Sequence, residues 1–151
     1  MYRSRGITLV ELLVVLAIMA IISAVAIPLY ATFTQRTYYT EAQTDLLACA
    51  QGMERHASVN FSYGNASGGG TANGGPIDVN ICDPLSVRAL RYTAFVVAGD
   101  DVSFSITATP TGVMAPPVSQ MISIDETGAR GFDTNSNGAI DAGEDAGWPD
   151  F

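Results

Sequence analysis

Residues 6–28 read GITLVELLVVLAIMAIISAVAIP, and this stretch sets the architecture of the first third of the chain. From Ile7 to Ile27 nearly every residue is apolar, and Glu11 is the one carboxylate among them. A helix of about 20 apolar residues is long enough to cross the hydrocarbon core of a bilayer. Because an ionised side chain is costly in hydrocarbon, such residues usually mark function. The stretch therefore predicts a membrane-length helix in which Glu11 has a task.

Two other interpretations of this stretch compete with that one. A secretory signal peptide is suggested by Ala24-Val25-Ala26, which has the small-residue pattern of a cleavage site. The apolar run, however, is longer than the usual 7–15 residues, and a carboxylate inside it is unfavourable. A plain membrane anchor fits the length but leaves Glu11 without a role.

The segment Gly6 to Val15, GITLVELLVV, resembles the N-terminal signature of type IV pilins and type II secretion pseudopilins. In that family a membrane-bound prepilin peptidase cuts after the leader glycine and methylates the new N-terminal amine. The resemblance places the cut between Gly6 and Ile7 and identifies Glu11 as the acidic residue at the fifth mature position. Ile7 departs from the usual Phe, and Pro28 falls where pilins carry a helix-bending proline.

The resemblance implies a structural subunit of a homo-oligomeric helical filament, without catalysis. In a bundle of apolar helices, an unpaired amine and an unpaired carboxylate are each costly, so we expect Glu11 of one subunit to pair with the Ile7 amine of a neighbour. The subunit would wait in the inner membrane with its head in the periplasm and then join an extracellular pilus. Adhesion, twitching and DNA uptake follow from the resemblance alone, and a type II secretion pseudopilin is the alternative.

The charge of the chain bears on its partners. Its 151 residues include 15 acidic and 7 basic residues, for a net charge of −8, and every basic residue is an arginine. Phosphate binding needs clusters of Lys and Arg. We therefore expect no nucleic acid as the main partner. His56, the single histidine, is expected at the surface or core edge and not in catalysis.

Cys49 and Cys82 are the two cysteines. An even number of cysteines in an exported chain favours one disulfide, with two free thiols as the alternative. On the chain-entropy account, closing a loop of this length would stabilise the fold by about 3–4 kcal/mol.

Apolar periodicity predicts one long helix from about residue 7 to about residue 58. Ala42, Leu46, Cys49 and Met53 recur at helical spacing and form one face. Pro28 should kink or locally open this helix, because proline lacks an amide donor. The sequence thus divides into a leader (1–6), a hydrophobic transmembrane or filament-core helix (7–28), an amphipathic second half of the helix (29–59) and a globular head (60–151).

The head is predicted to be α+β and pilin-like, with the helix packed on an antiparallel sheet of three or four strands. Residues 60–84 are rich in Gly, Asn and Ser and are expected to form a loop. Strand patterns follow over 90–98, 101–109 and 120–125. In the second of these, Val102 should share the inward face with Phe104, Ile106 and Ala108.

Residues 133–144, DTNSNGAIDAGE, fit the spacing of a 12-residue calcium loop. Such a loop supplies oxygen ligands at positions 1, 3, 5, 7, 9 and 12, and glycine at position 6 permits the sharp turn. The predicted Ca²⁺ ligands are therefore Asp133, Asn135, Asn137, the carbonyl of Ala139, Asp141 and Glu144. The alternative is an acidic turn in solvent. The loop should order the C-terminal tail and seat Trp148 against the head. It also keeps open a third function class, an exported calcium-dependent binding module with a cleaved signal peptide.

Overall fold

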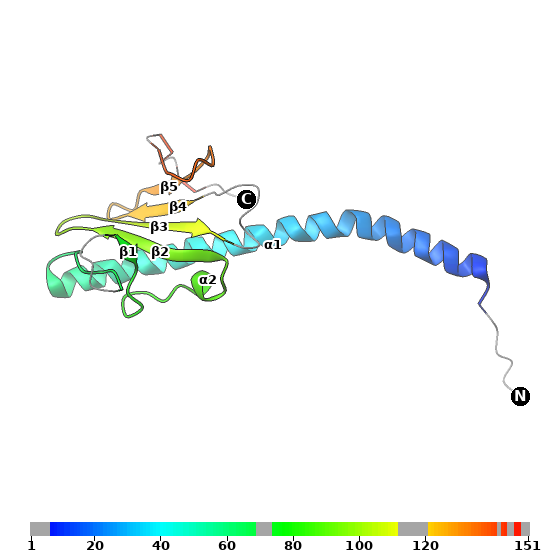
Figure 1. Ribbon diagram of the computed structural model, residues 1–151, viewed down its shortest axis with the longest axis horizontal. Helices are drawn as coiled ribbons and strands as arrows, with labels where there is room; N and C mark the ends of the chain where they lie inside the picture. Colours follow the sequence, from blue (N-terminus) through cyan, green and yellow to red (C-terminus); the bar gives the residue numbers. More distant parts are fainter. Residues whose placement is uncertain (1–6, 69–73, 112–120, 142, 145–146, 149–151) are drawn as a thin grey trace, which may run out of the picture. The chain divides into compact units, whose positions relative to one another are not determined.

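The computed structural model describes residues 7–68, 74–111, 121–141, 143–144 and 147–148 (Figure 1). Residues 1–36 and 37–151 form two separate compact units, and helix α1 (Leu9–Asn60) belongs to both. The other elements are β1 (Gly75–Pro76), α2 (Leu85–Arg88), β2 (Tyr92–Gly99), β3 (Phe104–Pro110), β4 (Ile122–Asp125) and β5 (Arg130–Phe132). The α+β class and the single long N-terminal helix are therefore confirmed.

The first unit is the N-terminal part of α1. The helix continues through Pro28 without a break. Of the two predicted effects of Pro28, a local opening does not occur, and a kink stays a prediction. Proline removes the helical hydrogen bond that its own amide would donate. The Thr32 hydroxyl donates to the Pro28 carbonyl at 3.1 Å, a side-chain bond to the preceding turn that does not replace the lost one.

The second unit is built on a five-stranded antiparallel sheet in the order β1-β2-β3-β4-β5. Each strand pairs with the next in sequence, so the sheet is a meander with short connections. The central pair aligns Val97 with Ile106, and β3 then aligns Ile106 with Ile124 on β4. This register places three β-branched residues side by side on one face of the sheet.

The core lies between that face and the second half of α1. All four residues of the predicted helix face are buried, and Tyr39 extends the face by meeting Phe132 of β5 edge-on at 5.9 Å. Between Tyr92 and Phe95 the pairing of β2 shifts at a bulge. A bulge adds one residue and reverses the alternation beyond it, which is why Tyr92, Phe95 and Val97 can all be buried.

Three expectations about the sheet are wrong. Its strands number five among the described residues, not three or four, because β1 and β5 are too short to show alternation. The strand predicted over 101–109 is β3, which begins only at Phe104, and Val102 lies in the preceding turn with 79% of its surface exposed. Asp100 explains this start, since its Oδ1 accepts the amides of Val102 at 2.8 Å and Ser103 at 2.7 Å. The strand predicted over 90–98 is β2, which begins at Tyr92, after a turn at Leu90.

Candidate functional site

The N-terminal part of α1 presents an apolar surface on all sides. From Leu9 to Phe33 its large hydrophobic side chains are at least half exposed, and the helix is long and apolar enough to cross a membrane. A helix that is hydrophobic all round is stable only when lipid or other protein surrounds it. This part of the chain is therefore built to be covered by something outside the subunit.

Glu11 lies in the first turn of α1, next to a helix cap that we did not predict. The Thr8 hydroxyl accepts a 3.2 Å hydrogen bond from the Glu11 amide, and the Leu12 amide donates to the Thr8 carbonyl. Thr8 to Glu11 also has the T-x-x-E spacing of a capping box. Because an acidic side chain near a helix N-terminus is favoured by the helix dipole, Glu11 also has a purely local role.

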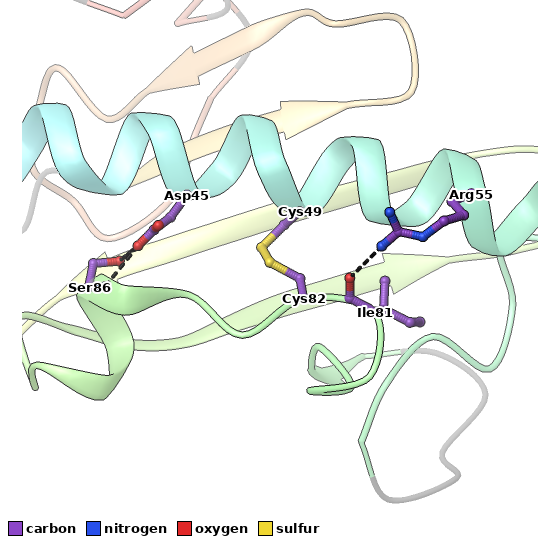
Figure 2. The surroundings of a disulfide bond; sticks show 6 residues. All are labelled: Asp45, Cys49, Arg55, Ile81, Cys82 and Ser86. Atoms are coloured by element: carbon purple, nitrogen blue, oxygen red, sulfur yellow. Dashed lines mark hydrogen bonds between the residues drawn. A yellow bond between two sulfur atoms is a disulfide. The ribbon is translucent and has the colours of Figure 1, made fainter.

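Residues 81–91, which we call the disulfide segment, run along the second half of α1 (Figure 2). Cys49 and Cys82 form a disulfide with their Cα atoms 5.1 Å apart, which confirms the predicted pair. One turn earlier on the helix, Asp45 Oδ2 accepts the Ser86 amide at 2.7 Å and the Ser86 hydroxyl at 2.6 Å. Ser86 is fully buried, so this contact satisfies two donors that water cannot reach.

Two further contacts extend this line in both directions. Toward the helix C-terminus, the Arg55 guanidinium donates to the Ile81 carbonyl at 3.4 Å. Toward the N-terminus, Arg91 forms an ion pair with Glu41, and its guanidinium carbon lies 3.9 Å from the ring centroid of Tyr38. Arg91 therefore binds within its own chain. The disulfide segment thus runs antiparallel to α1 and is fixed at intervals of about one to two turns.

The C-terminal loop wraps around Asp133, whose side chain is fully buried. Asp133 Oδ1 accepts the Asn137 amide at 3.2 Å, and Asp133 Oδ2 accepts the Gly138 amide at 3.0 Å. Gly138 has φ +83, a conformation that glycine adopts without strain. The turn that the sequence predicted at Gly138 is therefore present.

Five of the six predicted ligand residues form one hydrogen-bonded network through their side chains. Asp141 Oδ2 accepts from the side-chain amides of Asn135 at 3.2 Å and Asn137 at 2.7 Å. Glu144 Oε1 accepts from Thr134, and Glu144 Oε2 accepts the Asp141 amide at 2.9 Å. These bonds lower the pKa of Glu144, with the Asp141 amide the largest cause. Ala139 enters the network through its backbone, since its amide donates to Asn137 Oδ1 at 2.8 Å.

Within the described part of the chain, no three His, Cys, Asp or Glu side chains lie close enough together to hold a metal ion. The three carboxylates of the predicted calcium set, Asp133, Asp141 and Glu144, are therefore not gathered closely enough here to hold an ion by themselves, and the set also includes two Asn amides and one carbonyl. The metal site therefore stays a prediction. His56 is half-buried with its Nε2 3.1 Å from the Gly64 carbonyl oxygen, at the core edge.

The same loop is attached to the edge of the sheet. The Phe132 amide donates to the Glu144 carbonyl at 3.1 Å, and the Gly147 amide donates to the Arg130 carbonyl at 3.1 Å. Trp148 Nε1 donates to the Ser123 carbonyl at 3.1 Å, and the Arg130 guanidinium carbon lies 4.7 Å from the Trp148 ring centroid. The loop thus covers the free edge of β5, which would otherwise be open to pairing with another chain.

Comparison with known proteins gives the family. Residues 28–117 match the family described as "Type IV minor pilin ComP, DNA uptake sequence receptor". This match covers more than half of the chain. The chain belongs to this type IV pilin family. Residues 1–27 match the prokaryotic N-terminal methylation motif, so the resemblance seen in the sequence is confirmed.

The similarity of this pilin to individual curated proteins is confined to short stretches. It is 48% identical over 46 residues to the type IV major pilin protein PilA of Myxococcus xanthus (strain DK1622), covering 30% of this chain and 21% of that protein. It is 41% identical over 54 residues to two fimbrial proteins of Pseudomonas aeruginosa, covering 36% of this chain and 35% of each relative. The matched stretches thus span about a third or less of these relatives. No solved structure matches the chain.

The predicted site residues of the pilin fall into three groups. The cysteines are bonded, and the residues of the C-terminal loop lie together. Ile7 and Glu11 lie at the exposed start of α1, with Ile7 76% exposed. Gly6 lies outside the described residues. Sequence reasoning missed Thr8, Asp45 and Glu41, although the T-x-x-E spacing was a signal for the first of them.

Proposed function

We propose that this chain is a structural subunit of a type IV pilus. Prepilin peptidase cuts it between Gly6 and Ile7, and the mature chain assembles through its N-terminal helix. The observation that carries this proposal is the start of α1, an apolar helix whose large side chains are all at least half exposed and which has one carboxylate, in the segment that matches the N-terminal methylation motif. The subunit waits in the inner membrane with its head in the periplasm and is then moved into the extracellular filament. Its role is structural and not enzymatic.

Glu11 and the new Ile7 amine are the two charges that assembly brings together. Moving the apolar helix from lipid to a bundle of like helices exchanges one apolar environment for another, so it does little to choose an axial register. A buried charge without a partner is strongly unfavourable, which gives a large preference for the register in which amine and carboxylate meet. Cleavage is therefore needed for register, because Ile7 has no free amine before it.

The mature N-terminus and the filament together test this proposal. Mass spectrometry of sheared surface filaments should give a chain that starts at methylated Ile7. Glu11→Gln should reduce filament yield while the chain accumulates in the membrane. Thr8→Ala is the matched control, because it removes the helix cap at the same place and keeps the carboxylate. Glu11→Gln filaments in normal amount and register would contradict the proposed pair.

The same measurement separates the alternatives. A mature chain that starts at Ile27 would support an exported binding module with a cleaved signal peptide and would overturn the pilus proposal. A start at Ile7, combined with loss of protein secretion and not of surface filaments when the gene is deleted, would support a type II secretion pseudopilin.

We further propose that the C-terminal loop holds Ca²⁺. Its ligands would be Asp133, Asn135, Asn137, the Ala139 carbonyl, Asp141 and Glu144. Carboxylate, amide and carbonyl oxygens are the hard ligands that Ca²⁺ prefers. The hydrogen bonds from the Asn137 and Gly138 amides to Asp133 support this proposal. They wrap the loop around the Asp133 side chain, and each of its two carboxylate oxygens keeps a further lone pair that could bind the ion. Bound calcium would neutralise charge in the loop and hold it against β5.

Titration calorimetry of the detergent-solubilised chain tests the calcium site. We expect one site with a dissociation constant of about 10⁻⁵ to 10⁻³ M, the range of extracellular modules. EDTA should lower the melting temperature, and Glu144→Gln should weaken binding. Glu126→Gln is the control, as it removes an equal charge outside the loop. A melting temperature that changes neither with added calcium nor with EDTA would refute the calcium site.

DNA is a second candidate partner, because the matching family is described as a DNA uptake sequence receptor. The net charge of −8 opposes this for our chain, and Arg91 of the disulfide segment is paired with Glu41. We expect sheared filaments to bind labelled duplex DNA no more tightly than about 10⁻⁵ M at physiological salt, within the non-specific range. Fluorescence anisotropy measures this, and sequence-dependent submicromolar binding would make DNA a main partner.

A further inference from the structure

Two bulky apolar residues of the head are held in the left-handed conformation that favours glycine. Phe61 has φ +56 and follows the last residue of α1, and Leu90 has φ +55 just beyond α2. Their side chains are 91% and 80% exposed, so the core gains nothing from them. A large residue at positive φ is strained, and glycine or asparagine would suit both places better. Such strain at an exposed apolar residue points to a contact outside the subunit.

Phe61 belongs to an apolar and acidic patch at the far end of α1. Val59 and Val102 are also exposed there, at 72% and 79%. The Ser62 hydroxyl donates to Asp101 Oδ1 at 2.9 Å, which joins the end of the helix to the β2–β3 turn. We call Val59, Phe61, Asp101 and Val102 the distal patch.

Leu90 belongs to an apolar patch at the opposite end of the head, which also carries the exposed ion pair of Arg88 with Asp83. Leu85 and Arg88 of α2 are exposed beside it. Arg88 pairs with Asp83 at 3.3 Å, but its side chain stays 65% exposed, and a guanidinium with five N–H donors can bind a second carboxylate. We call Leu85, Arg88 and Leu90 the proximal patch.

The two patches lie at opposite ends of the second unit. In Figure 1, α2 lies near one end of the sheet, while the end of α1 and the β2–β3 turn lie at the other. Ser86 of α2 contacts Asp45, and Phe61 follows Asn60, so the patches are separated along the helix by about 15 residues, or roughly 20 Å. One molecule therefore cannot close the two patches on each other.

We propose that the distal patch of one subunit binds the proximal patch of a second copy of this chain. Phe61 and Val102 would meet Leu85 and Leu90, and Asp101 would meet Arg88, so apolar area and charge are complementary. A contact between two different patches is heterologous, and when its rotation does not close a ring it propagates as an open helix. This inference rests on the proposed pilus function and adds a contact between heads to the contact between N-terminal helices.

Cross-linking in filaments tests the pairing. Cells producing a Val102→Cys chain together with a Leu90→Cys chain should yield, on mild oxidation, covalent dimers joined through the two introduced thiols. Val79→Cys replaces Val102→Cys in the control, because Val79 is 70% exposed and lies in neither patch. Filaments in which the 102/90 pair gives no more dimer than the 79/90 pair would refute the head contact and leave the pilus function intact. Absence of filaments from the unmodified chain would instead refute the pilus function.

Substitution by asparagine separates assembly from folding. Phe61→Asn and Leu90→Asn remove the apolar anchor and supply a residue that tolerates positive φ, so neither should lower the melting temperature. Each should reduce filament yield at least about tenfold, as buried anchor residues do at interfaces. Val79→Asn should leave the yield unchanged. Normal yield from both variants would overturn the proposal.

Discussion

Asp45 caps a helix to which it does not belong. Its Oδ2 accepts the Ser86 amide at 2.7 Å and the Ser86 hydroxyl at 2.6 Å, at the first turn of α2. The residue at the N-cap position of α2 is Pro84, whose side chain makes no capping bond. A helix N-terminus needs an acceptor for its first amides, and α1 supplies it from 41 positions earlier in the chain.

Removal of the Asp45 carboxylate should clearly lower the free energy of unfolding of the head. Asp45→Ala leaves two donors of a buried serine without an acceptor, so we expect a loss of about 1–3 kcal/mol in the free energy of unfolding. Urea denaturation followed by Trp148 fluorescence measures it. Asp83→Ala breaks the exposed ion pair with Arg88 and should cost less than about 1 kcal/mol. Equal losses from the two variants would show that the buried cap adds nothing.

Gly52→Ala should destabilise the head, although the same change in an exposed helix normally stabilises by about 1 kcal/mol. A Cβ added at Gly52 would lie 2.5 Å from the Ile81 carbonyl oxygen, and that backbone is held by the neighbouring disulfide. The urea midpoint should therefore fall. Gln51→Ala, at an exposed position one residue earlier, serves as the control and should change it little. A raised midpoint for Gly52→Ala would mean that the disulfide segment can move aside.

Reduction of the Cys49–Cys82 bond should lower the free energy of unfolding by about 3–4 kcal/mol, given the separation of 33 residues. Urea curves with and without dithiothreitol give the difference. The double variant Cys49→Ala/Cys82→Ala should be equally destabilised and insensitive to the reductant. A reductant effect that persists in the double variant would come from some other source.

Asp100 should make the head less stable in acid. The backbone amides of Val102 and Ser103 hold the pKa of this carboxyl below its ordinary value of 3.8. A lowered folded-state pKa means that the carboxylate stabilises the fold above that ordinary value, and that the contribution is lost as pH falls through the lowered pKa. Asp100→Asn should flatten the fall of the urea midpoint between about pH 5 and about pH 2. Asp83→Asn, an equal change of charge at an exposed ion pair, is the control. If the urea midpoint of Asp100→Asn fell in acid as steeply as that of the unmodified chain, the Asp100 turn would be excluded as the cause of the acid sensitivity.

The sequence was most informative where a pattern repeats over many residues. The helical spacing of Ala42, Leu46, Cys49 and Met53 predicted the buried face of α1, and all four are buried. Alternation likewise predicted the inward residues Phe104, Ile106 and Ala108 of β3, although not the turn that contains Val102. The N-terminal signature predicted the family through a dense local match.

Features that depend on contacts distant in sequence were not predictable in this way. β1 and β5 exist because a neighbouring strand offers hydrogen bonds, and neither is long enough to show a period. The bulge in β2 reverses the alternation after Tyr92, which a strict two-residue pattern cannot express. Asp45 and Glu41 lie outside the predicted apolar face of α1, and nothing local in the sequence indicates that Ser86 and Arg91 return to meet them.

The contacts between α1 and the disulfide segment also have a mechanical consequence. A pilus under load would transmit tension along α1, and the bonds made by Asp45, Cys49 and Arg55 lie in one line along that direction. Force along α1 would load these contacts in shear, and the covalent disulfide would hold after the hydrogen bonds had broken. We expect the chain between Cys49 and Cys82 to stay closed under load while the disulfide is intact, and the head to extend further once it is reduced.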